Sequence, residues 1–185
     1  MPNYYFDIET TGLEPKDHKI ITIQFMELDS ITSKPNGKLT ILKEWESSES
    51  DILKEFIERS KITGDYPFSF VPVGYNLKFE HNFLIERTRI NKLEIVDILK
   101  RPFIDLIPFG IVMNKGQFKG SGLDKITGKS RPGNMVPEWY AKKDYTEIIK
   151  YIENETEEFV KFSSWLYKEL PPMLDRFKKE HGINK

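Results

Sequence analysis

The chain has 185 residues, with 28 lysines and arginines against 29 aspartates and glutamates, and it contains no cysteine. A chain of this length forms one domain with a sizeable core. Without cysteine there can be no disulfide framework, thiolate zinc site, iron–sulfur cluster or cysteine nucleophile, so a metal would have to bind oxygen or imidazole. The composition therefore favours hard cations such as Mg²⁺ or Mn²⁺.

The formal net charge of −1 provides no global attraction to nucleic acid, so such a substrate would have to be held by local basic patches. One candidate patch is the segment 114–131, in which five basic residues and one acidic residue give a local charge of +4. This segment is either an ordinary solvated loop or a clamp for the nucleic-acid backbone. On the second interpretation, Lys115 and Lys119 contact the substrate.

The start of the chain lacks a basic region followed by an apolar stretch, the pattern that is typical of a secretory signal. No run approaches the ~18 consecutive apolar residues that indicate a membrane span. We therefore expect a soluble, cytoplasmic protein that does not bind a membrane.

The first third of the chain has the pattern of strands separated by turns. Segments rich in β-branched and aromatic residues predict strands at residues 4–9, 18–28 and 38–45. Residues 48–62 then change to a helical period, with Ser50 as the expected N-cap.

The remainder of the chain alternates strand and helix before a long final helix. Residues 70–75 are expected to form a short buried strand, and residues 79–90 a helix. A last helix is expected over residues 143–170, where the prolines at 171 and 172 would end it.

A loop with a short helix near residues 123–126 is expected over residues 114–133, which contain five glycines. The order of the elements predicts an α/β fold in which a mixed sheet is flanked by helices. We expect a single domain over residues 1–185, with a C-terminal helical extension from about residue 171.

Asp7 and Glu9 stand two residues apart on the first expected strand. Side chains alternate along a strand, so both carboxylates share one face, whereas Phe6 and Ile8 point into the core behind them. Two like charges on one sheet face repel each other and, unless both are solvated, favour a cation between them. The pair alone fits either a wet edge strand or a metal site.

Two later segments place further candidate groups at regular positions. Glu80 lies at an expected strand-to-helix junction, in the sequence Gly-Tyr-Asn-Leu-Lys-Phe-Glu. Tyr151 and Glu155 are four residues apart in the last helix, which places a phenol and a carboxylate on one face. Each feature alone is common on helix surfaces, whereas their order and spacing together are improbable.

These segments resemble the motifs of the DEDD superfamily of 3′–5′ exonucleases, the DnaQ-like group with an RNase H-like fold. The first motif of the family, Asp-x-Glu followed by Thr-x-Gly, is similar to Phe-Asp-Ile-Glu-Thr-Thr-Gly-Leu at residues 6–13. The second motif resembles Asn76 to Glu80 followed by a Phe-Leu pair. The third motif resembles Tyr151 and Glu155 in its tyrosine form, Tyr-x-x-x-Asp.

The resemblance implies an RNase H-like mixed sheet of about five strands with helices on both faces, and carboxylates gathered at the edge of the first strand. It implies two divalent cations, Mg²⁺ or Mn²⁺, with Asp7 bridging them. Glu9 and Glu155 would complete the first cation site, and Glu80 would help to hold the second through water. Tyr151 would orient the attacking water.

The implied substrate is a single-stranded or frayed 3′ end of DNA or RNA. By the resemblance, the backbone from Thr10 through Thr11 and Gly12 would contact the terminal nucleotide, and Asn76 would also contact the substrate. Leu13 is expected either to wedge against the last base or to be an ordinary core leucine.

The family has Asp at both later acidic positions, where this chain has Glu80 and Glu155. The two ions of such a site lie ~3.5–4 Å apart, so two longer side chains require a compensating shift of the backbone. Two hypotheses follow. The protein is a metal-dependent 3′–5′ exonuclease, or it is a catalytically weak or inactive exonuclease-like module that binds nucleic-acid ends or a protein partner.

Overall fold

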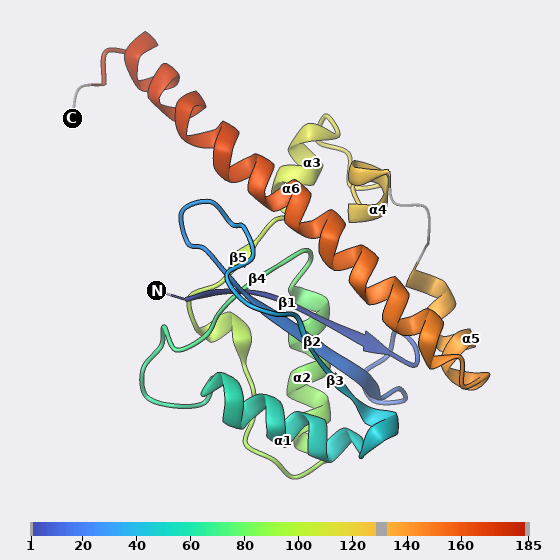
Figure 1. Cartoon of the computed structure of the whole chain (residues 1–185). Helices are drawn as coiled ribbons and strands as arrows, with labels where there is room; N and C mark the ends of the chain where they lie inside the picture. Colours follow the sequence, from blue (N-terminus) through green and yellow to red (C-terminus); the bar gives the residue numbers. More distant parts are fainter. Residues whose placement is uncertain (1, 129–132, 184–185) are drawn as a thin grey trace.

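A computed structural model describes residues 2–128 and 133–183 of the chain (Figure 1). Its centre is a five-stranded mixed sheet with the order β3-β2-β1-β4-β5. β2 pairs antiparallel with both β1 and β3, whereas β4 pairs parallel with both β1 and β5. The strands are β1 (Asn3–Thr10), β2 (Ile20–Leu28), β3 (Thr40–Lys43), β4 (Val71–Gly74) and β5 (Ile104–Asp105). β1 is therefore the central strand, and the alternative interpretation of it as an edge strand with a solvated face is wrong.

Helices cover both faces of the sheet, with α1 and α2 on one side and α6 running diagonally across the other (Figure 1). The helices are α1 (Glu49–Ser60), α2 (Lys78–Ile90), α3 (Ile107–Met113), α4 (Leu123–Thr127), α5 (Val136–Ala141) and α6 (Tyr145–Glu180). Short 3₁₀ turns are η1 (Glu44–Glu46), η2 (Ile98–Lys100) and η3 (Gly133–Met135). This arrangement confirms the predicted α/β fold with a five-stranded mixed sheet.

The core beneath α1 and α2 is built around aromatic rings. Phe6 of β1 points into it, as the alternation along the strand predicts. The Phe56 ring of α1 lies 5.2–5.8 Å from the rings of Phe6, Phe25 and Phe70, measured between centroids. β1 is thus held from one side by a dense apolar layer.

The opposite face of β1 packs against α6. Tyr5 and Phe159 lie 4.8 Å apart between ring centroids, in a cluster that also contains Val73, Phe162 and Leu166. Because the same strand is buried on both faces, its backbone is fixed, and so are the directions of the polar side chains near its carboxyl end.

The start of α1 and the presence of α5 differ from what the sequence predicted. Ser48, not Ser50, is the N-cap of α1, because Ser48 is extended and its side chain accepts a hydrogen bond from the Asp51 amide. α5 was not predicted, since its six residues are too few for a periodic pattern.

The prolines at 171 and 172 do not end the last helix, since both lie inside α6, which continues to Glu180. Each proline removes one N–H donor and so releases the carbonyl of the residue four positions earlier. From residue 171 onward α6 is almost entirely exposed and extends beyond the sheet (Figure 1). The released carbonyls belong to Tyr167, which is half-buried, and Lys168, which is exposed. Neither residue lies in the core, so water can reach these carbonyls and the helix tolerates the prolines.

We expect Phe56→Ala to lower the free energy of unfolding by about 3–5 kcal/mol, because it would leave a cavity among three aromatic rings. Ile31→Ala is the control, since the Ile31 side chain is exposed and such a change costs at most about 0.5 kcal/mol. Urea denaturation followed by circular dichroism measures both. Equal stability of the two variants would contradict the proposed central role of Phe56.

Candidate metal centre

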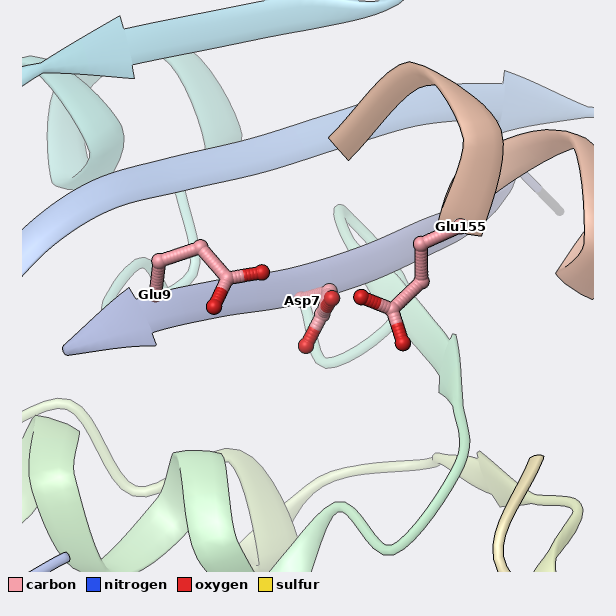
Figure 2. A group of neighbouring side chains, drawn as sticks. All are labelled: Asp7, Glu9 and Glu155. Carbon is pink, nitrogen blue, oxygen red and sulfur yellow. The ribbon is translucent and has the colours of Figure 1, made fainter. Parts of the chain in front are cut away.

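Three carboxylates from two distant parts of the chain meet beside the central strand. Asp7 and Glu9 come from β1, and Glu155 reaches toward them from α6, so that Asp7 lies between the other two (Figure 2). One oxygen from each carboxylate lies within 4.8 Å of the others. The sharing of one strand face by Asp7 and Glu9 agrees with the prediction from alternation.

Asp7 is held by three donors on its own and the neighbouring strand. Its Oδ1 accepts a hydrogen bond from the Ile8 amide at 2.9 Å, and its Oδ2 accepts from Gln24 Nε2 at 3.1 Å and Tyr5 hydroxyl at 3.3 Å. Burial, and then the negative charge of Glu155, raise the pKa of Asp7 to about 7. The position of the carboxylate is fixed, but its charge is costly without a cation.

Glu80, in the first turn of α2, is only 5% exposed and lies against Asp7. Burial, followed by the charge of Asp7, raises the pKa of Glu80 well above its usual value. The two carboxyl groups share a hydrogen bond, which requires a proton on one of them. Within the described part of the chain, Glu80 Oε2 is buried and has no hydrogen-bond partner.

The Tyr151 phenol is buried one helical turn before Glu155, to whose carboxylate it donates a hydrogen bond. Burial and the nearby charges of Glu9 and Glu155 raise the pKa of Tyr151 far above its usual value, so the hydroxyl keeps its proton. A Cβ built on Gly133 would lie 2.6 Å from the Tyr151 hydroxyl oxygen. The glycine therefore lets the backbone approach the phenol closely.

A pocket with a volume of about 360 Å³ opens onto these groups. Of the predicted site residues, Asp7, Asn76, Tyr151 and Glu155 line it. Its other walls come from β1, the turn after β4, the segment from α3 to α4, η3 and α6. The residues are Tyr5, Tyr75, Ile107, Gly122, Leu123, Asp124, Gly133 and Phe159. Volumes of this size are typical of small-ligand sites.

Asp105, at the end of β5, supports the site, although it was not predicted from the sequence. Its carboxylate accepts hydrogen bonds from the backbone amides of Asn76 at 2.8 Å, Leu77 at 3.0 Å and Ile107 at 3.1 Å. These bonds hold Asn76 at a φ of 70° and fix the turn that leads to Glu80. The only available signal was a carboxylate at the end of a weak strand pattern, which is common.

The segment after β1 is a tight loop whose polar groups bond within the loop. The Thr10 hydroxyl donates to the Gly12 carbonyl at 2.6 Å, and the Thr11 hydroxyl accepts from the Lys19 amide at 3.1 Å. A Cβ on Gly12 would lie 2.5 Å from the His18 ring, so a larger residue there would displace that ring. Leu13 is 79% exposed, which excludes the core alternative for this residue.

Lys115 and Lys119 lie in the connection between α3 and α4, outside the residues that line the pocket. Both are exposed. The short helix α4 that follows confirms the element predicted near residues 123–126. The basic positions 129 and 131 of the candidate clamp lie outside the described residues.

The groups at this site fit hard divalent cations. All the ligands are carboxylate oxygens, which Mg²⁺ and Mn²⁺ prefer, and the Asp7, Glu9 and Glu155 oxygens are close enough to share one ion. The buried, unpartnered Glu80 Oε2 is an acceptor beside Asp7 for which a second ion or its water would provide a partner.

The sequence profile of the RNase H superfamily matches residues 4–167, which is most of the chain. The chain belongs to the RNase H superfamily. This agrees with the five-stranded mixed sheet and confirms the RNase H-like fold. No curated protein matches the chain in a sequence search.

Solved structures of exonuclease I share this RNase H-like fold. Exonuclease I of E. coli in complex with a dT13 oligonucleotide gives a TM-score of 0.59 at 11% identity, over 95% of this chain and 43% of that chain. A product-bound exonuclease I gives a TM-score of 0.61 at 11% identity, over 95% of this chain and 45% of that chain. An ExoI/SSB-Ct complex gives a TM-score of 0.59 at 12% identity, over 95% of this chain and 43% of that chain. The chain spans less than half the length of these proteins, and such identities show the fold alone.

Within residues 2–128 and 133–183, no helix combines the length and apolar character that a membrane crossing requires.

Raising the pH of the metal-free protein from 5 to 8 should lower its Tm. The pKa values of Asp7 and Glu80 are higher in the folded than in the unfolded state, so folding binds protons in this window. The contribution of these two groups to the free energy of unfolding is therefore fully present at low pH and is lost as the pH rises through their folded pKa values. This contribution is on the order of a few kcal/mol.

Mg²⁺ or Mn²⁺ should reverse this loss, and the rise in Tm that the metal causes should be larger at pH 8 than at pH 5, where protons compete for the ligands. Asp7→Asn is the control, because it removes one of the repelling charges and should flatten the pH profile. A metal-free Tm that increases with pH over this range would contradict the assignment of buried, mutually repelling carboxylates. Differential scanning fluorimetry measures all of these values.

Proposed function

We propose that this protein is a metal-dependent 3′–5′ exonuclease that hydrolyses the terminal phosphodiester bond at single-stranded or frayed 3′ ends of DNA or RNA. The observation that carries the proposal is the convergence of Asp7, Glu9 and Glu155 within 4.8 Å, with the buried Glu80 against Asp7. Gathering so many acidic groups at one site is unfavourable in the absence of cations. The site is therefore suited to chemistry on a phosphodiester that needs bound metal ions.

In this proposal Asp7, Glu9 and Glu155 would hold one Mg²⁺ or Mn²⁺ ion, and Asp7 and Glu80 would help to hold a second. When bound, two such ions lower the pKa of the attacking water and stabilise the charge on the phosphate and on the leaving 3′ oxygen. Hydrolysis forms a bond between the water oxygen and phosphorus and breaks the bond to the 3′ oxygen. The products are a nucleoside 5′-monophosphate and a shortened strand.

Tyr151 is suited to position the attacking water. Its hydroxyl is buried, keeps its proton because its pKa is raised, and is bound to the Glu155 carboxylate. A hydroxyl oxygen can also accept a hydrogen bond, so it can orient a water molecule beside the carboxylates. We assign the site to the tyrosine form of the DEDD motifs on this basis.

The terminal nucleotide would occupy the 360 Å³ pocket, with Asn76 in its wall. The backbone of Thr10, Thr11 and Gly12 would contact the nucleotide, and the exposed Leu13 would wedge against the last base. The structures of exonuclease I in complex with dT13 and with product support a single strand as the substrate.

The proposal is tested with a 5′-labelled single-stranded oligonucleotide, as DNA and as RNA, in Mg²⁺ and in Mn²⁺. We expect a ladder of products shortened from the 3′ end. Asp7→Asn should lower the rate by at least about 100-fold, because it removes the charge that both ions share. The same variant should be at least as stable as the wild type without metal at pH 8, since it relieves repulsion.

The two hypotheses predict different results in this assay. No ladder in either metal, with retained binding of the oligonucleotide, would overturn the exonuclease and favour an inactive module that binds nucleic-acid ends. Activity that Asp7→Asn leaves intact would belong to a contaminant or to another site.

Glu155→Asp should change the rate and the relative activity in Mg²⁺ and Mn²⁺, because it withdraws a ligand oxygen by about 1.5 Å. We expect at least about a 10-fold fall in one of the two metals. Glu157→Asp is the matched control, since Glu157 is an exposed glutamate of the same helix. Unchanged rates of Glu155→Asp in both metals would show that the length of this side chain does not matter.

A further inference from the structure

The connection between α3 and α4 is an ordered loop. Asn114 Nδ2 donates hydrogen bonds to the carbonyls of Gln117 at 2.9 Å and Lys119 at 3.0 Å, which closes the loop from inside. The Ser121 hydroxyl, in turn, donates to the Phe118 carbonyl at 2.6 Å. These bonds fix the backbone on both sides of Phe118.

The same loop is anchored to the wall of the pocket. The Tyr75 hydroxyl, beside Asn76, donates a hydrogen bond to the Ser121 carbonyl. Gly122 and Leu123, which follow directly, line the pocket together with Asp7 and Glu155. Phe118 precedes Gly122 by four residues, so its Cα lies at most about 14 Å from that of Gly122. The loop therefore leads directly into the wall of the pocket that holds the candidate metal centre.

The side chains that this loop presents to solvent are aromatic and basic. Phe118 is 79% exposed, although burial of a phenylalanine is worth about 1.5–3 kcal/mol. Lys115 and Lys119 flank it in sequence and are exposed as well. Among the residues that the structure describes, neither lysine forms an ion pair with a carboxylate.

We propose that Phe118 is a stacking platform for a base of the single-stranded nucleic acid whose 3′ end lies in the pocket, with Lys115 and Lys119 contacting phosphates beside that base. Exposed aromatic rings next to cations are the surface with which proteins bind single strands without sequence preference. The phosphates carry the charge that complements the two lysines. The proposal rests on the exonuclease function and deepens it, because it defines a contact away from the reacting bond.

The platform is tested by fluorescence anisotropy with a 5′-fluorescein-labelled dT oligonucleotide and its RNA counterpart. Ca²⁺ replaces Mg²⁺ in this assay so that the oligonucleotide binds without being degraded. Ca²⁺ also binds carboxylate oxygens, but at longer distances and with a more variable coordination than Mg²⁺. Phe118→Ala should weaken binding by about 5- to 100-fold. Phe177→Ala is the matched control, since it removes an exposed ring near the end of α6 and should leave the affinity unchanged.

Two further variants separate stacking from a merely structural role. Phe118→Trp should retain the affinity, and the fluorescence of its indole should be quenched on binding, after subtraction of the wild-type signal. Lys115→Gln and Lys119→Gln should each make the salt dependence of binding shallower by about 0.7 in the log–log slope, because each removes one phosphate contact.

The outcomes distinguish this proposal from the exonuclease function. If the wild type produces no ladder in Mg²⁺ or Mn²⁺ but Phe118→Ala still weakens binding, the platform stands and the exonuclease function is wrong. If the wild type degrades the oligonucleotide and Phe118→Ala changes neither affinity nor KM, the platform is wrong and the loop faces a different partner, such as a protein. If the wild type does not bind a single strand, both are wrong.

Discussion

The repulsion among buried carboxylates at the end of β1 is the constraint on which the site depends. Glu155 and Glu80 both act on Asp7, and burial raises the pKa values of Asp7 and Glu80. Such an arrangement is unfavourable unless the rest of the fold supplies the energy to hold it. That energy comes from the apolar layers on both faces of the sheet, which fix β1 as the central strand.

The site gathers groups that are far apart in the chain because two strands and one helix pass near the same place. β1 provides Asp7 and Glu9, the turn after β4 leads to Glu80, and α6 brings Tyr151 and Glu155 across the sheet. Asp105 on β5 closes this arrangement by hydrogen-bonding to the turn before α2. A metal centre built in this way joins both ends of the domain, so ions bound there would also stabilise the fold.

Glu80 and Glu155, which stand where the resemblance leads us to expect aspartates, are compatible with a compact centre. Glu155 extends from a helix and still places an oxygen within 4.8 Å of Asp7 and Glu9. Glu80 is buried tightly enough to share a hydrogen bond with Asp7. The spacing of the supporting elements therefore accommodates the additional methylene of each side chain, and carboxylate chemistry is retained at all four positions.

The sequence by itself determined the features that depend on local periodicity. Alternation along β1 placed Asp7 and Glu9 on one face, and the helical period placed Tyr151 beside Glu155. Only the tertiary structure decided that Leu13 is exposed, that Asp105 holds the turn before Glu80, and that α6 continues through its prolines. These outcomes depend on which distant segments pack together and where solvent reaches the backbone, and no local pattern records either one.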